Sequence, residues 1–261
     1  MIKKFLSFAV VAALFVACGP DNEPDPKPNE KPGTETPGEN EEEKEPEFVS
    51  AITIDGEYSD WDAVEAIVAT LPEVGTPKYS QLKTLKAYAD EYFICLYMEF
   101  DPSNLVRTID LFINDDNDPV TGHKNLSGGW EECVGLMLQG SFYNFNADYT
   151  TQLGGKSWDP SIYMFGGEDG GEAWEWVNMG VGGAASSSIA AMIDETTAAV
   201  EIQIIREMLP IPLADTIGLG VIIETANWSS VGALPAIAEE DKIENGATNH
   251  LLSLTLPQAE I

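Results

Sequence analysis

Residues Val106–Ile113, with the sequence VRTIDLFI, decide the fold class of this chain of 261 residues. Apolar side chains at positions 109, 111 and 113 alternate with Thr108, Asp110 and Phe112. An alternation with a period of two is typical of a β-strand that buries one of its faces. We therefore expect a strand at residues 106–113.

Short runs of the same kind recur on both sides of this stretch, with turn signals between them. We expect further strands at Phe48–Ile54, Leu82–Ala89, Tyr92–Phe100, Cys133–Gln139, Val200–Ile205, Ile217–Glu224 and His250–Leu256. Tyr92–Phe100 is apolar on both faces and should be a central, covered strand. We expect one short helix within Asp62–Leu71 and a turn at Arg206–Leu209. The pattern predicts an all-β domain over residues 48–261, a two-sheet antiparallel β-sandwich of jelly-roll or immunoglobulin-like type.

The first residues carry the pattern of a secretory signal peptide, which we assign to residues 1–17. Lys3 and Lys4 precede an apolar stretch from Phe5 to Val16 that is too short to cross a bilayer. The stretch ends in Ala17 and Cys18, which resembles the cleavage site of bacterial lipoproteins. We therefore expect Cys18 to be lipidated, with more than one acyl chain for stable anchoring. The alternative is an ordinary signal peptide.

Residues 18–47 have the composition of a disordered, extended tether. Seven prolines and 11 acidic residues stand there against three lysines, with almost nothing apolar to bury. Gly19 after the cysteine resembles lipoproteins of the outer membrane, and Asp21, Glu23 and Asp25 resemble the export tags of surface lipoproteins. We expect an outer-membrane, lipid-anchored protein that faces the cell exterior, with a periplasmic orientation as the alternative.

The charge of the chain restricts its partners. Asp and Glu total 44 against 13 Lys and Arg, which gives a formal net charge of −31. Nucleic-acid phosphates would be repelled, so we expect no nucleic-acid partner. No apolar run is long enough for a spanning helix, so we expect contact with a membrane through the lipid anchor only.

Five motifs in order resemble the family 9-like carbohydrate-binding modules and the related DOMON-type sandwiches. They are Ile52–Trp61 (ITIDGEYSDW), Leu85–Leu96 (LKAYADEYFICL), Ile109–Asp118 (IDLFINDDND), Val200–Leu209 (VEIQIIREML) and Ile217–Val221 (IGLGV). In the first motif, Asp55 and Gly56 favour a tight turn, and we expect Trp61 to be structural. The resemblance implies a β-sandwich and a saccharide ligand.

A segment rich in aromatic residues lies between the expected strands at 133–139 and 200–205. It contains Phe142, Tyr143, Phe145, Tyr149, Trp158, Tyr163, Phe165, Trp174 and Trp176. Flat rings bury the C–H faces of sugars, and neighbouring polar side chains bind the hydroxyls. We expect the ligand-binding residues to be Trp158, Tyr163, Trp174, Trp176 and Trp228. The alternative is that these rings fill a core.

The segment Asn114–Gly122 is the densest cluster of side-chain oxygens in the chain. Asn114, Asp116 and Asp118 stand at alternate positions, with Glu131 or Glu132 available from the next segment. Such a set suits Ca²⁺, so we consider a calcium site here, although the spacing is not that of an EF-hand. The alternative is a turn held by its own side-chain to backbone hydrogen bonds.

No catalytic constellation stands out. We find no acidic residue in an apolar setting that would mark a raised pKa, and no nucleophile motif around Ser186–Ser188. His123 and His250 are expected on the surface, and Cys95 and Cys133 as buried thiols unless they form a disulfide. We expect a non-catalytic glycan-binding lipoprotein with no certain cofactor. The alternative is a structural or protein-binding module of a surface assembly.

Overall fold

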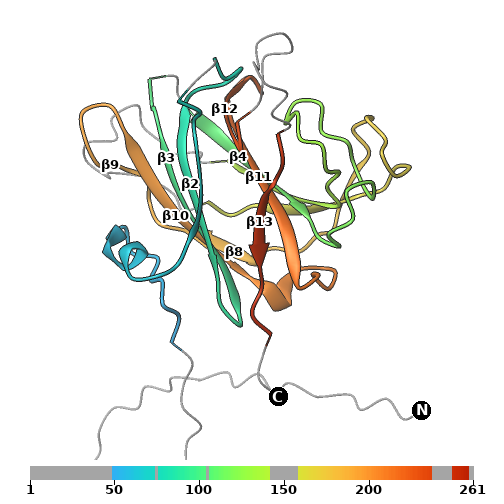
Figure 1. Ribbon diagram of the computed structural model, residues 1–261, viewed down its shortest axis with the longest axis horizontal. Coiled ribbons are helices and arrows are strands. Elements are labelled where there is room, and N and C mark those ends of the chain that lie inside the picture. The colour runs from blue at the N-terminus through green and yellow to red at the C-terminus, as the bar shows by residue number, and fades with distance from the viewer. Residues whose placement is uncertain (1–48, 74–75, 104–105, 142–157, 237–248, 259–261) are drawn as a thin grey trace, which may run out of the picture. The chain divides into compact units, whose positions relative to one another are not determined.

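The computed structural model describes residues 49–73, 76–103, 106–141, 158–236 and 249–258 (Figure 1). The predicted signal peptide, Cys18 and the tether lie outside these residues, as do Phe142, Tyr143, Phe145 and Tyr149. The described residues belong to one unit, Phe48–Ile261. Within them, no helix combines the length and the apolar character needed to span a bilayer.

One antiparallel sheet of six strands forms the first layer of the described domain. Its order is β1-β2-β3-β10-β8, and β9 also pairs with β10. The strands are β1 (Ile67–Thr70), β2 (Leu82–Ala89), β3 (Phe93–Phe100), β8 (Ala185–Ser187), β9 (Ala191–Met192) and β10 (Ala198–Ile205). The expected central strand is confirmed, since β3 lies between β2 and β10 and is buried on both faces.

An antiparallel sheet of seven strands forms the second layer. Its order is β12-β11-β4-β5-β6-β7, and β13 also pairs with β11. The strands are β4 (Val106–Asn114), β5 (Leu136–Ser141), β6 (Ser161–Phe165), β7 (Trp176–Asn178), β11 (Thr216–Thr225), β12 (Ser230–Leu234) and β13 (Leu252–Thr255). β4 and β11 lie side by side in Figure 1. The predicted two-sheet antiparallel β-sandwich is confirmed.

The core lies between the two sheets and is built by the alternation that the sequence shows. Leu96 and Ile202 from the first sheet, and Ile109, Leu111 and Ile113 from the second, are fully buried members of one cluster. Burial of such side chains contributes about 1.5–3 kcal/mol each relative to leaving them in water. The intervening residues of β4, Thr108, Asp110 and Phe112, therefore face outward from the second sheet.

Trp61 covers the outer face of the first sheet, as the sequence predicts. The 3-10 turn η1 (Tyr58–Asp62) brings its indole against Cys95, Tyr97 and Ala199. The indole Nε1 donates a hydrogen bond to Oε1 of Glu201 over 3.0 Å, and the Gly56 amide donates to Oε2 over 3.1 Å. Gly56 has a φ of +86°, which explains why a glycine occupies this turn.

Two sequence-based expectations about elements are wrong, and some strands were not expected. Residues 49–54 form no strand; Ile52 instead packs against the outer face of the first sheet. The expectation of a helix within Asp62–Leu71 is wrong, because Ile67–Thr70 forms strand β1, which pairs with β2. β6 and β7, which were not expected as strands, extend the second sheet within the aromatic segment. The expected turn at Arg206–Leu209 is confirmed by the 3-10 turn η2 (Arg206–Met208).

Candidate functional site

The outer face of the second sheet carries a continuous group of aromatic rings, which we call the aromatic cluster. It consists of Phe112, His123, Trp130, Phe165, Trp174 and Trp176. Trp176 contacts Phe112 at a centroid distance of 6.2 Å and Phe165 at 5.5 Å. Trp174 contacts Trp176 at 6.0 Å. The cluster thus joins the central strand β4 to the edge strand β7.

A glycine on β11 makes room for one end of the aromatic cluster. A Cβ atom on Gly220 would lie 2.5 Å from the ring of Trp130. The indole therefore packs directly on the backbone of β11, and its Nε1 donates a hydrogen bond to the Pro235 carbonyl over 3.1 Å. Gly220, within the expected strand at 217–224, is therefore explained by close packing against Trp130 and not by a turn.

The ring of His123 packs against Trp174 and Trp176. It was expected on the surface, but it is only 3% exposed. Its ring lies 5.9 Å from Trp174 and 5.4 Å from Trp176, edge to face in both cases. Its Nδ1 lies 3.1 Å from the Gly171 carbonyl, which can only accept, so this nitrogen donates. Burial lowers the pKa of His123, so the ring is neutral at physiological pH.

Beside the aromatic cluster lies a cavity of about 360 Å³, which we call the acidic cavity. Its lining residues are Asp110, Gln139, Trp174, Glu224 and Trp228. Asp110 pairs with Gln139 across β4 and β5, while Glu224 on β11 stands opposite Thr108. Three neighbouring strands thus supply the polar groups. Trp174 comes from the segment before β7, and Trp228 from the turn between β11 and β12.

The polar and aromatic residues of the acidic cavity differ sharply in burial. Asp110 is 3% exposed, whereas Trp174 and Trp228 are 60% and 61% exposed. The carboxyl group is therefore deep in the cavity, and the two indoles lie where they meet solvent. A volume of this size falls at the lower end of the range for small-molecule sites.

Burial governs the electrostatics of the acidic cavity. Loss of hydration, together with repulsion from Glu224, raises the pKa of Asp110 to about 8, although a hydrogen bond from Gln139 acts in the opposite direction. Burial also raises the pKa of Glu224, which accepts a hydrogen bond from the Ser230 hydroxyl over 3.2 Å. None of the five lining residues is basic. At neutral pH this pair of carboxyl groups therefore retains a proton more readily than two isolated carboxyl groups would.

Trp228 is held in an uncommon backbone conformation. Its φ is 59°, in the left-handed region that bulky residues avoid. The turn is fixed by hydrogen bonds from the Trp228 amide to the Thr225 carbonyl and from the Thr225 amide to the Ser229 carbonyl, both 3.0 Å long. A bulky residue in this region costs about 1–2 kcal/mol, and such strain gathers at functional sites.

The five predicted ligand-binding residues fall into three groups. Trp174 and Trp228 are exposed and line the acidic cavity. Trp176 and Tyr163 lie on the same face of the sheet but are half-buried against its packed residues. Trp158 is 0% exposed and belongs to the core between the sheets, with its amide bonded to Ser187 of β8. We therefore leave Trp158 out of the site.

The segment Asn114–Gly122, in which we considered a calcium site, is held by hydrogen bonds between its own residues. The Asp118 amide donates to Asp116 Oδ1 over 2.9 Å, and the Val120 amide donates to Asp118 Oδ1 over 3.1 Å. Asn114 donates to the Asp118 carbonyl over 3.1 Å, and Glu132 binds His250 instead of joining the loop. Among the described residues, no three His, Cys, Asp or Glu side chains are grouped as metal ligands. The calcium site stays a prediction, and we derive nothing from it.

Sequence reasoning did not identify the polar residues of the acidic cavity. In the sequence, Asp110 is only a polar position of an alternating strand. We expected no acidic residue in an apolar setting that would mark a raised pKa, and Asp110 shows that this expectation is wrong. The available signal was the alternation itself, because Asp110 stands between Ile109 and Leu111 in the middle of a strand. Cys95 and Cys133 are both buried and free, so the structure contains no bond between them.

No known protein family has a sequence model that matches this chain, and no curated protein is similar to it in sequence.

Proposed function

We propose that this protein binds a glycan without catalysis, at the acidic cavity on the outer face of the second sheet. One observation carries the proposal: Trp174 and Trp228 expose most of their indole surface around a cavity whose polar groups are Asp110, Gln139 and Glu224. Indole faces cover the C–H surfaces of a sugar ring, and carboxylate and amide groups bind its hydroxyls. A cavity of about 360 Å³ suits one sugar residue, with neighbouring residues extending over the exposed rings.

The proposal includes an outer-membrane, surface-facing lipoprotein anchored through Cys18. It rests on the sequence of residues 1–47, in which a short apolar stretch ends at Cys18 and an acidic, proline-rich segment follows. An extended spacer of this composition reaches roughly 3 Å per residue. A glycan-binding domain on such a spacer samples polymers at a distance from the membrane.

The test is glycan-array screening followed by calorimetry of the full chain and two variants. Trp174→Ala removes one exposed indole, and Trp228→Gly removes the other while placing at φ 59° the residue that suits this backbone. We expect each variant to weaken binding about fivefold to thirtyfold, since one stacked ring contributes roughly 1–2 kcal/mol. Tyr92→Ala, an exposed aromatic residue at the start of the first sheet's hairpin, is the matched control and should bind normally.

Absence of binding across a broad saccharide panel would overturn the glycan proposal. The alternative is a module that binds a protein partner. The observation that favours it is the exposure of Val177 and Met179, which adjoin Trp174 and Trp176 at the edge of the second sheet. Under that alternative, Val177→Glu abolishes capture of a protein while no saccharide competes.

A hydrolase is favoured by a different observation, the raised pKa of Asp110 beside Glu224. A protonated carboxyl group next to a second one is the arrangement that glycosidases use. The bound oligosaccharide should be recovered intact after prolonged incubation with the protein. Release of shorter products, lost in Asp110→Asn, would replace the binding proposal with the hydrolytic one.

A further inference from the structure

The acidic cavity is built to receive positive charge. Two of its five lining residues, Asp110 and Glu224, are acidic, and none is basic. Asp110 is 3% exposed, so little water remains to compensate its charge. Burying a carboxylate without a partner is costly, and proteins ordinarily provide a cation or several hydrogen-bond donors. The residues that line this cavity provide no cation, and they give Asp110 a single hydrogen bond, from Gln139.

The hydrogen bonds of the cavity leave one acceptor without a donor. Asp110 Oδ2 receives a long hydrogen bond of 3.3 Å from Gln139 Nε2. Asp110 Oδ1 is buried and has no hydrogen-bond partner. A buried carboxylate oxygen without a donor is uncommon; Glu201, for example, has two donors. Because Asp110 lines a cavity, its unpartnered oxygen points to a donor supplied by a ligand.

An ammonium group meets this demand better than a hydroxyl group does. It carries three donors and a full charge, and its hydrogen bonds to carboxylates are roughly twice as strong as those between neutral groups. Trp174 and Trp228 add to the preference, because indole faces attract cations. A neutral hydroxyl would bond to Asp110 Oδ1 but would supply no positive charge that lets Asp110 and Glu224 ionise side by side.

We propose that the glycan recognised here carries a free amine, as in a 2-amino-2-deoxyhexose residue, and that its ammonium group binds between Asp110 and Glu224 beside the two exposed indoles. This inference rests on the proposed function, and it names the class of sugar that the site selects. An acetylated amine would lose the charge and would not satisfy the two carboxyl groups.

The experiment compares three tetrasaccharides by calorimetry on the full chain at pH 7: β-1,4-linked glucosamine, N-acetylglucosamine and glucose. We expect the glucosamine tetrasaccharide to bind at least about tenfold more tightly than the other two, from one charge-assisted contact and cation–π attraction. Ammonium binding should also release a proton from Asp110, whose neighbours in the cavity are the titratable Glu224 of β11 and the uncharged Gln139 of β5. The enthalpy should therefore depend on the ionisation enthalpy of the buffer.

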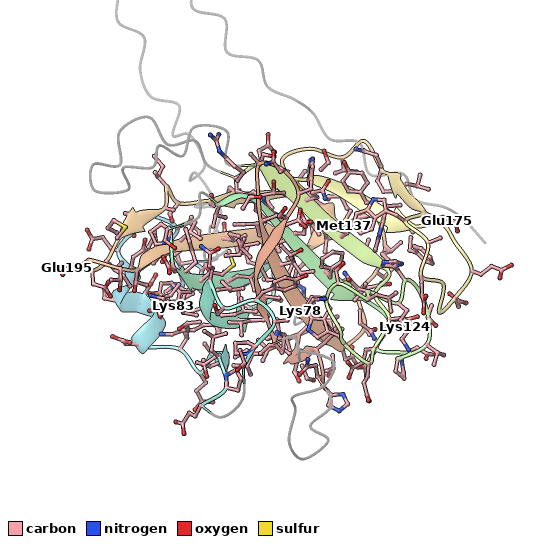
Figure 2. The ribbon with its side chains drawn as sticks, turned by 90° about the horizontal axis from the view of Figure 1, so that it is seen from above. Lys78, Lys83, Lys124, Met137, Glu175 and Glu195 are labelled. Atoms are coloured by element: carbon pink, nitrogen blue, oxygen red, sulfur yellow. The ribbon has the colours of Figure 1, made fainter. Side chains whose placement is uncertain are left out.

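Two variants assign the preference to the cavity. Asp110→Asn and Glu224→Gln keep the shape of each side chain and remove its charge, so each should reduce the preference for the amine to about twofold or less. Glu195→Gln removes one charge from an exposed site and should preserve the preference. Figure 2 shows Glu195 at the opposite end of the domain from Glu175, which neighbours Trp174, so this variant reports only the effect of net charge.

The outcomes separate the two proposals. If the glucose or N-acetylglucosamine tetrasaccharide binds as tightly as the amine, or more tightly, glycan binding stands and the inference fails. If no saccharide binds but ethanolamine does, the cavity recognises a primary ammonium group without a sugar, and both proposals fail as stated. If the preference for glucosamine persists unchanged in Asp110→Asn and Glu224→Gln, it arises outside this cavity and the inference is wrong.

Discussion

A single buried carboxyl group, that of Asp110, accounts for most of the chemical character of the site. It occupies the outward face of β4, where Phe112 on the same face packs in the aromatic cluster. Its neighbours across the strands are an amide on β5 and, diagonally, a second carboxyl group on β11. A residue that costs stability in this way is expected where function requires it.

Asp110 should make the stability of the protein fall as the pH rises from about 4 to about 8. Its pKa in the folded state is about 8, whereas an unfolded chain has a value near 3.9 for aspartate. Below about pH 4 both states are protonated; between the two values only the unfolded state ionises, which favours unfolding by a few kcal/mol at most. Asp110→Asn should therefore be more stable than the wild type at pH 8 and nearly equal to it at pH 4, as measured by urea denaturation.

The comparison must be made as a difference between variants, because other acidic residues also titrate in this range. Burial raises the pKa of Glu224, Glu201 and Asp115 as well. Glu195→Gln, which is exposed, is the control and should show no difference that grows with pH. A difference between Asp110→Asn and the wild type that stays flat from pH 4 to pH 8 would contradict the raised pKa.

The site was predictable in its aromatic half and not in its polar half. Tryptophans are visible in the sequence, and two of the predicted ones, Trp174 and Trp228, do line the cavity, whereas Trp158 is buried in the core. Asp110, Gln139 and Glu224 stand 29 and 85 positions apart in sequence. Alternation assigns each of them to a face, but strand order and register decide which polar residues meet, and these depend on the whole fold.

At the scale of elements, β11 organises the second sheet. It pairs with β4, β12 and β13, and its outer face presents Gly220 beneath Trp130 and Glu224 beside the cavity. Because Trp130 contacts Phe112 and Phe112 contacts Trp176, the packing of one glycine is connected to the rings around the site.

Gly220→Ala should destabilise the domain by about 1–3 kcal/mol, because the new methyl group overlaps the ring of Trp130 and the indole must move. Urea denaturation measures this loss. Gly182→Ala is the matched control: a Cβ atom there meets nothing within 4 Å, and the change in stability should stay within about 0.5 kcal/mol. Equal stability of the two variants would show that Trp130 does not pack on β11 as described.

The elements were predictable where alternation or continuous burial is strong. β2, β3, β4, β10, β11 and β13 lie where apolar patterning places them. β7, β8 and β9 are strands of two or three residues, too short for any pattern to emerge. Residues 62–71 were misjudged because apolar spacing suited a helix, while pairing of Ile67–Thr70 with β2 decided the outcome.

At the scale of the whole molecule, a strongly acidic chain carries a site that we propose for a cationic sugar. The formal charge of −31 attracts polycations over a Debye length of about 10 Å at moderate salt. Residues 18–47 are themselves strongly acidic, so under this proposal they would raise the local concentration of an amine-bearing polymer without contributing to selectivity. Selectivity then belongs to the cavity, and general attraction to the chain as a whole.

The anchoring that we propose through Cys18 would determine where such a molecule works. In cells that process lipoproteins, Cys18→Ala should move the chain from the detergent-rich phase to the aqueous phase on detergent partitioning and abolish its labelling by a palmitate analogue. The reason is that a thiol is the group that takes the lipid. No helix among the described residues is long and apolar enough to cross a bilayer in its place. Cys133→Ala, which alters a buried thiol of the fold, is the control and should keep both label and partitioning. If Cys18→Ala retains both, the lipoprotein proposal is wrong, while glycan binding by the β-sandwich remains open to its own test.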